Sequence, residues 1–157
     1  MQLQTLFGPA WARMNNEGAV TAFGFGTNPE ENKSATGEDP EVARQIAEYF
    51  EGLRHAFMLS LAPRGTPFQL QVWSELVKVP AGETITYTEL GRRVGRENAP
   101  RAAGRANALN PIALLIPCHR VVGANGELTG YAYGLDMKKK LLDFERMAAA
   151  RRTKENS

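Results

Sequence analysis

The chain has 157 residues, of which 43% are hydrophobic and 23% are charged, an ordinary composition for a soluble globular protein. No apolar run approaches the roughly 18–20 residues that span a bilayer, and we expect no signal peptide at the N-terminus. A single cysteine, Cys118, excludes an internal disulfide and a multi-cysteine metal cluster, so we expect a cytoplasmic protein that uses no metal.

The formal net charge of +2 conceals an asymmetry between two parts of the chain. Residues 1–62 contain four basic and eight acidic residues, a net charge of −4, whereas residues 63–157 contain fifteen basic and nine acidic residues, a net charge of +6. Either these charges form solvated faces of different sign, or the second part approaches a polyanion such as a nucleic acid.

The first part, residues 1–62, predicts a small subdomain of strands and one helix. Residues 3–26 alternate loosely between apolar and polar, with turn signals between the segments, which indicates two or three antiparallel strands. The polar stretch 27–39 predicts a loop, and residues 56–61 predict a further strand. We find no chemistry in this part, and we expect its one histidine, His55, at the surface or a helix end.

The helix of this subdomain is predicted from its first residues. Asp39 is a capping residue, and Pro40 follows it in the first turn. The apolar residues expected on one face of the helix are Val42, Ile46, Tyr49, Phe50 and Leu53.

The second part, residues 63–157, predicts mostly helices. Thr66 and Gln69 form a capping box, followed by a helix, and Thr86 with Glu89 forms a second one for a helix that ends at Gly95. Asn98 is expected to cap a third helix, which ends near Leu109. The apolar positions of the first of these helices are Leu70, Val72, Trp73, Leu76 and Val77.

The remainder of this part leads from an apolar segment to a last helix. Residues 112–116, "IALLI", predict a buried extended segment, which places Cys118 at the end of a strand. The four glycines in residues 123–134 predict a loop. A helix is expected from about Leu135 to Ala150, with a frayed basic tail after it.

The helices at 88–94 and 99–109 have the spacing of a helix-turn-helix, although many such hairpins bind no DNA. The second of them contains Gly104, which costs a helix about 1 kcal/mol relative to alanine. Either the backbone approaches a partner closely, or the helix packs tightly on a neighbour. Arg101 and Arg105 share one face and could contact phosphates or solvent. The small residues of this helix are Ala102, Ala103, Gly104, Ala106 and Ala108.

A lone cysteine is most often a small buried hydrophobe, but the surroundings of Cys118 favour chemistry. His119 and an arginine follow it, and positive charge favours the thiolate. Glu145 lies at helical spacing from Leu141 and Leu142, so we expect its carboxylate to face inward, where it needs a partner such as His119. Cysteine, histidine and an orienting carboxylate together form an activated nucleophile.

The segments "IPCHRVVG" and "LTGYAYGLDMKKKLLDFE" resemble the active-site region of the O6-alkylguanine-DNA alkyltransferases, also called methylated-DNA–protein-cysteine methyltransferases. The upstream stretch "GTPFQLQVWSELVKVPAGETITYTELGRRVGRENAPRAAGRANALNP" is similar to the same family, so the resemblance covers Gly65 to about Glu145. It implies an α+β fold, with an RNase H-like N-terminal subdomain over 1–62 and a helical, winged-helix-like domain over 63–157. It also implies a cytoplasmic monomer without cofactor, membrane contact or obligate protein partner.

The resemblance further implies a one-way transfer of an alkyl group from O6 of guanine, and also from O4 of thymine, to the protein. Cys118 would accept the group, while His119 would take the thiol proton through a water and Glu145 would hold the imidazole. Asn110 would tie the DNA-binding helix to the active-site segment. Tyr87 would contact the base and its 3′ phosphate and protonate the departing guanine at N3.

Other residues would bind double-stranded DNA through its minor groove. Arg101 would enter the duplex where the base leaves, since O6 is reachable only after base flipping. The helix at 99–109, with Ala102, Gly104 and Arg105, would lie in the groove. Main-chain groups of Cys118 and Val121 would accept from the guanine amino group, and the loop at Tyr131 and Ala132 would wall the pocket and donate to O6.

Tyr133 departs from the family pattern, which has a glycine there. Tyrosine is strained at this position if its φ is positive, and otherwise it narrows the pocket rim.

Three alternatives to this family remain. A lesion-binding alkyltransferase-like protein would replace the cysteine, a helix-turn-helix regulator would read the major groove with polar side chains, and a cysteine hydrolase would need an oxyanion hole.

Overall fold

The structure is a computed structural model that describes residues 1–29 and 37–155, and in this part the chain divides into two compact units. The first contains the residues before Gly65 together with Pro111–Leu115, and the second contains Gly65–Asn110 and the residues from Ile116 onward. The sequence placed the boundary after residue 62 and did not anticipate the return of Pro111–Leu115 to the first unit. The α+β class is confirmed.

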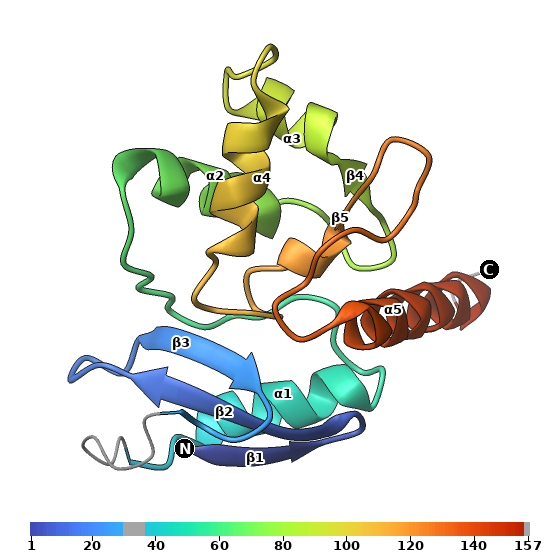
Figure 1. Cartoon of the computed structure of the whole chain (residues 1–157). Helices are drawn as coiled ribbons and strands as arrows, with labels where there is room; N and C mark the ends of the chain where they lie inside the picture. Colours follow the sequence, from blue (N-terminus) through green and yellow to red (C-terminus); the bar gives the residue numbers. More distant parts are fainter. Residues whose placement is uncertain (30–36, 156–157) are drawn as a thin grey trace. The chain divides into compact units, whose positions relative to one another are not determined.

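The first unit contains a three-stranded antiparallel sheet in the order β1-β2-β3, with helix α1 against β1 (Figure 1). The strands predicted over 3–26 are therefore confirmed. Their bounds, and that of the helix, are β1 (Gln2–Thr5), β2 (Gly8–Met14), β3 (Val20–Phe25) and α1 (Pro40–Phe50). Of the loop predicted over 27–39, residues 30–36 lie outside the described residues, and the rest contains no helix or strand.

Helix α1 begins as its sequence predicts and ends earlier than its apolar pattern suggests. The Asp39 side chain accepts hydrogen bonds from the backbone N–H groups of Glu41 and Val42. Val42, Ile46 and Tyr49 are buried. The placement of Leu53 on this face was wrong, because the helix ends at Phe50 and Leu53 is 73% exposed.

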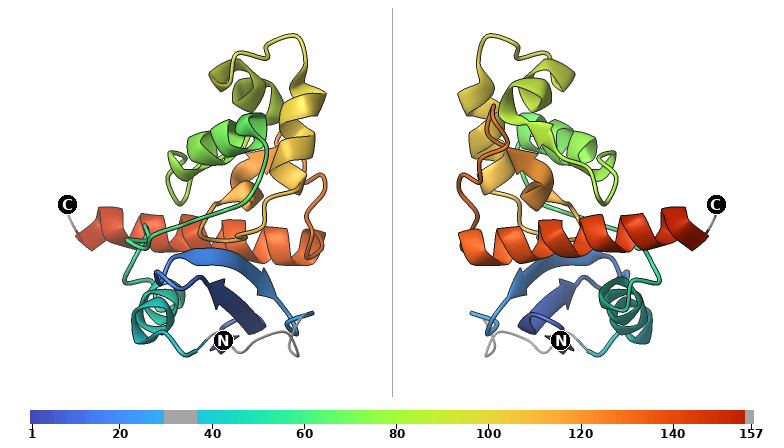
Figure 2. Two further views of the ribbon diagram at one scale, coloured as in Figure 1. Left: turned by 90° about the vertical axis from the view of Figure 1, so that its left-hand side faces the viewer. Right: turned by 90° about the vertical axis from the view of Figure 1, so that its right-hand side faces the viewer.

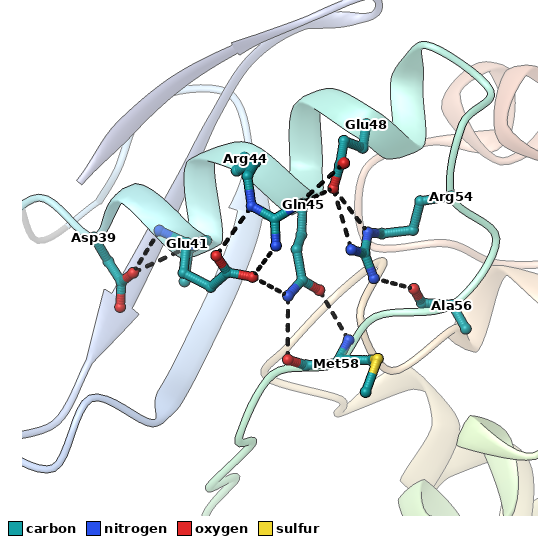
Figure 3. A network of polar contacts seen from close by, with 9 residues as sticks. Asp39, Glu41, Arg44, Gln45, Glu48, Arg54, Ala56 and Met58 are labelled. Carbon is teal, nitrogen blue, oxygen red and sulfur yellow. Dashed lines mark hydrogen bonds and ion pairs between the residues drawn. The ribbon is translucent and has the colours of Figure 1, made fainter.

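The strand predicted over 56–61 was also wrong, and a side chain takes the backbone hydrogen bonds of Met58 within it. The buried Gln45 amide accepts from Met58 N at 2.8 Å and donates to Met58 O at 3.1 Å (Figure 3). The backbone of Met58 is therefore paired with a side chain of α1 and not with a strand. Within 56–61, only Leu61 forms a bridge, a parallel one to Val20. His55 is exposed, as expected.

The second unit is mostly helical, with α3 packed on α4 and α2 packed on both (Figure 1). Strands β4 and β5 form a short parallel pair, and α5 is a single long helix (Figure 2). No helix in the described residues is long and apolar enough to cross a membrane. The bounds are α2 (Pro67–Val77), β4 (Ile85–Thr86), α3 (Tyr87–Arg93), α4 (Pro100–Ala108), β5 (Val121–Val122) and α5 (Leu135–Glu155).

The helix starts of this unit match the sequence predictions in part. The Thr66–Gln69 capping box is present with both of its hydrogen bonds. At α3, Thr86 accepts from Glu89 N, while the Glu89 carboxylate binds arginines within the helix. Asn98 was wrongly assigned as a cap, since α4 is preceded by Ala99 and has no side-chain capping bond. Of the predicted apolar face of α2, Val72, Trp73 and Leu76 are buried, whereas Leu70 and Val77 are exposed.

Two predictions around the apolar segment and the last helix need correction. Residues 112–116 are buried as expected, but they form a turn in which Leu115 N donates to Ala113 O and Leu114 has a φ of 69°. Cys118 therefore follows a turn and not a strand. The tail predicted to be frayed after Ala150 is helical through Glu155.

Candidate functional site

Cys118, His119 and Arg120 form one turn of 3₁₀ helix and are all buried. The bend turns the chain sharply at Cys118, which an extended strand could not do. Asn110, just after α4, donates from Nδ2 to Ile116 O at 2.8 Å, and so ties the end of that helix to the segment that enters the turn. Asn107 of α4 also donates to Cys118 O, at 3.4 Å. The cysteine is thus fixed to α4 through its backbone.

Helix α5 brings Glu145 to this turn, as its spacing from two buried leucines predicts. Glu145 is 1% exposed, and its Oε2 lies 3.0 Å from His119 Nε2. Burial alone raises the pKa of Glu145, but the hydrogen bonds and positive charge of His119 and Arg120 outweigh it, so the pKa is well below its usual range. The carboxylate is therefore ionised at neutral pH.

Arg120 is a member of this cluster that the sequence reasoning did not identify. Its guanidinium donates to both Glu145 oxygens, from Nε to Oε1 at 2.9 Å and from Nη2 to Oε2 at 2.7 Å. Nη1 donates to Val79 O at 2.7 Å. A buried carboxylate needs more donors than one imidazole can supply. The arginine next to His119 in the sequence could therefore have been predicted as the second partner of Glu145.

Burial lowers the pKa of His119, and the nearby Glu145 only partly opposes this shift, so the ring is neutral at pH 7. Nε2 faces an ionised carboxylate and therefore carries the ring proton, which leaves Nδ1 as an acceptor. Nδ1 is buried and has no hydrogen-bond partner within the described residues. An oriented base with a vacant lone pair thus lies beside the cysteine.

Burial also raises the pKa of the Cys118 thiol, and a hydrogen bond with Asn110 and the charge of Lys138 act in the opposite direction. The resting cysteine is therefore a thiol, which has to lose its proton in order to react. The neighbouring neutral imidazole is the group suited to take that proton.

Lys138 is a second residue that the sequence reasoning missed. It is 0% exposed, and Nζ donates to Thr129 O at 2.8 Å and to Gly130 O at 3.2 Å. Its helical spacing from Leu141, Leu142 and Glu145, the same signal that pointed to Glu145, could have placed it on the inner face.

Thr129 and Gly130 belong to the loop that connects β5 to α5, which is orange in Figure 1. Tyr87, the first residue of α3, contacts this loop. Its hydroxyl donates to Thr129 O at 3.1 Å. Gly104 of α4 lies against its ring, because a Cβ atom at Gly104 would lie 3.3 Å from Tyr87 Cδ1. This glycine therefore makes room for Tyr87.

Tyr131 and Tyr133 face each other in the same loop, and Ala132 between them is exposed. The two rings meet edge to face with centroids 5.8 Å apart, and the Tyr131 ring lies 6.5 Å from that of His119. Burial raises the pKa of both phenols. Among the described residues only Leu114 has a positive φ without being glycine, so Tyr133 is not strained. Val121 is buried in β5, paired with Ile85.

The small residues of α4 divide between two faces. Ala103 and Ala106 are buried within the unit, and Trp73 Nε1 donates to Ala106 O at 2.8 Å. These two alanines serve internal packing, which is the second of the two alternatives that the sequence left open for this helix. Arg101, Ala102 and Arg105 are exposed, so the outer face of α4 combines two cations with little bulk.

The fold and site define a helix-turn-helix protein with a buried cysteine, histidine and carboxylate. Residues 67–147 match the model of the 6-O-methylguanine DNA methyltransferase DNA-binding domain. A methylated-DNA–protein-cysteine methyltransferase of Methanosarcina acetivorans is 53% identical over 105 residues, which are 67% of this chain and 67% of that protein. A protein of the same name from Mycobacterium tuberculosis is 47% identical over 105 residues, 67% of this chain and 64% of that one.

Solved structures agree with this assignment. A crystal structure of M. tuberculosis O6-methylguanine methyltransferase superposes with a TM-score of 0.83 at 35% identity, covering 94% of this chain and 92% of that one. A structure of M. tuberculosis OGT in complex with DNA gives a TM-score of 0.82 at 37% identity, with the same coverage. The chain belongs to the methylated-DNA–protein-cysteine methyltransferase family.

Proposed function

We propose that this protein repairs DNA by moving an alkyl group from O6 of guanine, and from O4 of thymine, to Sγ of its own Cys118. The observation that carries the proposal is the acceptor lone pair on His119 Nδ1, held in a buried site by the ionised Glu145. That nitrogen takes the thiol proton through a water, and the resulting thiolate attacks the alkyl carbon. An S–C bond forms, the C–O bond breaks, and the electron pair leaves with guanine.

Tyr87 completes the proton balance of this step. Its hydroxyl donates a proton to N3 of the departing guanine and becomes a phenolate, and the proton that left the thiol passes from the His119 imidazolium to this phenolate through solvent. The product thioether is stable, so each protein molecule reacts once. Relatives and a solved neighbour named for methylated DNA, and a neighbour solved with DNA, support this reading.

Double-stranded DNA is the proposed partner, bound through its minor groove by the outer face of α4. Arg101, Ala102 and Arg105 are exposed there, and small side chains permit close approach to a narrow groove. The target base has to leave the stack, because O6 is inside it, and Arg101 fills the vacated space. Main-chain groups of Cys118 and Val121 accept from the guanine amino group.

The loop that carries Tyr131, Ala132 and Tyr133 walls the pocket, where it donates to O6. Tyr133 is half-buried, packs on Tyr131 and follows an unstrained path, so its ring occupies space that a glycine would leave open. The pocket is therefore suited to methylguanine more than to bulky alkyl groups.

The proposal is tested with a duplex that carries O6-methylguanine labelled in the methyl group. One equivalent of label is expected on Cys118 per protein molecule, and the repaired guanine is expected to remain in the DNA. Lesion binding without transfer would instead support an alkyltransferase-like protein, and repeated release of product would support a hydrolase.

A further inference from the structure

Lys138 on α5 is a buried cation that the transfer step above does not use. Lysine is almost never fully buried without a partner, because removing an ammonium group from water is costly. The two acceptors that the structure gives it are the carbonyl oxygens of Thr129 and Gly130, in the loop that walls the pocket. The hydrogen bonds of its ammonium group therefore hold that loop against α5.

The Thr129 carbonyl is shared between Lys138 and Tyr87. Lys138 Nζ lies 2.8 Å from this oxygen and Tyr87 Oη lies 3.1 Å from it. The same ammonium lies 5.9 Å from the centroid of the Tyr87 ring, within range of a cation–π contact. One carbonyl thus joins the first residue of α3, the pocket loop and α5.

This sharing matters for a hydroxyl that has to act on a substrate. To reach a base, Tyr87 has to give up its bond to Thr129 O, which removes one of the two donors of that oxygen. A carbonyl oxygen has two lone pairs, and Lys138 occupies one of them whether or not Tyr87 remains. The loop therefore keeps its anchor while the hydroxyl moves.

We propose that Lys138 is a positioning residue for alkyl transfer: it anchors the Thr129–Gly130 segment and so allows the Tyr87 hydroxyl to pass from the loop to the substrate. This inference rests on the proposed function and on the role proposed there for Tyr87.

The first experiment compares Lys138→Met with Lys139→Met in single-turnover transfer from an O6-methylguanine duplex. Methionine keeps the apolar stem of Lys138 and removes the charge and the donors. We expect the rate to fall at least tenfold. Lys139, next to it on α5, is exposed and binds only Asp143 in the described residues, so its variant is expected to stay within twofold of the wild type.

The second experiment is a double-mutant cycle with Tyr87→Phe, which a merely structural role of Lys138 would not satisfy. Because Lys138 acts through the Tyr87 hydroxyl, Lys138→Met is expected to cost less than twofold in the Tyr87→Phe background. If circular dichroism shows Lys138→Met to be unfolded, Lys138→Gln takes its place. The glutamine side chain is one atom shorter than that of lysine, carries no charge and keeps a polar end. We expect the same fall in transfer rate for this variant, and the same suppression of that fall in the Tyr87→Phe background.

Three results would overturn the inference: a Lys138 variant at the wild-type rate, an undiminished loss in the Tyr87→Phe background, or a Tyr87→Phe variant as fast as the wild type. These are distinct from failure of the proposed function, in which the wild-type protein itself would transfer no label and both proposals would fall.

Discussion

Two polar clusters, one in each unit, show how differently buried polar groups are used in this chain. In the first unit, both ends of the Gln45 amide are hydrogen-bonded, and around it Glu41, Arg44, Glu48 and Arg54 form partly exposed ion pairs (Figure 3). In the second unit, Glu145 is fully engaged, yet His119 Nδ1 and the Tyr131 hydroxyl are buried with no partner in the described residues. A satisfied network stabilises a fold, whereas an oriented group with unused hydrogen-bonding capacity is available for a reaction.

The largest expected effect is the complete loss of transfer in Cys118→Ser. A serine hydroxyl is far less acidic than a thiol, so the neutral His119 cannot generate a comparable nucleophile. Labelled duplex measures the loss, and a binding assay with the same duplex is the control, because the outer face of α4 is unchanged. Transfer of label to the serine variant would show that another residue is the acceptor.

Glu145→Gln tests whether the engaged carboxylate orients the base. The change leaves the buried Arg120 without its counter-charge and replaces one of the two carboxylate oxygens that His119 and Arg120 bind with an amide NH2 group. We expect transfer to slow at least a hundredfold and the free energy of unfolding to fall by about 3–5 kcal/mol. Urea titration and single-turnover kinetics measure the two effects. A variant of unchanged rate would separate His119 from the chemistry.

Tyr133→Gly tests the size selection that we propose for the loop between β5 and α5. Removing a half-buried ring from a position of ordinary φ opens space, so reaction with O6-benzylguanine is expected to speed up about tenfold while O6-methylguanine reacts within twofold of the wild-type rate. Competition between the two substrates for Cys118 provides the measurement. If both rates change together, the ring has a role other than size selection.

The pH dependence follows from the direction of the His119 pKa. Burial lowers it, so the transfer rate is expected to remain constant as the pH falls through about 6.5, the ordinary imidazole value, and to decline only in more acidic solution. The unfolded chain takes up the imidazole proton first, so the free energy of unfolding decreases as the pH falls below about 6.5. A rate that halves at pH 6.5 would contradict this assignment.

Gln45→Ala provides the matched control in the first unit and is expected to have the smallest effect on transfer. It leaves the N–H and C=O groups of Met58 without their side-chain partner. The free energy of unfolding is expected to fall by about 1–3 kcal/mol, with a transfer rate unchanged within twofold. Denaturant titration beside the transfer assay tests it, and a slower transfer would mean that the first unit contributes to the chemistry.

Much of the fold was predictable because its signals are local. Capping residues predicted the starts of α1 and α2, and alternation predicted the antiparallel strands. The errors lie where a distant group replaced a local preference. Residues 56–61 have the composition of a strand, but the Gln45 side chain takes both backbone hydrogen bonds of Met58, and only the end of the segment pairs with β3. Residues 112–116 are apolar enough for a strand, but they form a turn at Leu114.

The site divides in the same way. By itself the sequence determined the single cysteine, its neighbouring histidine, the inward direction of Glu145 and the family resemblance, because these follow from adjacency, helical spacing and a specific motif. Only the tertiary structure decided that Arg120 shares the carboxylate, that Gly104 makes room for Tyr87, and that Lys138 reaches the loop between β5 and α5. Those contacts join residues far apart in the chain, and spacing along a sequence carries no information on which backbone carbonyl a long side chain will meet.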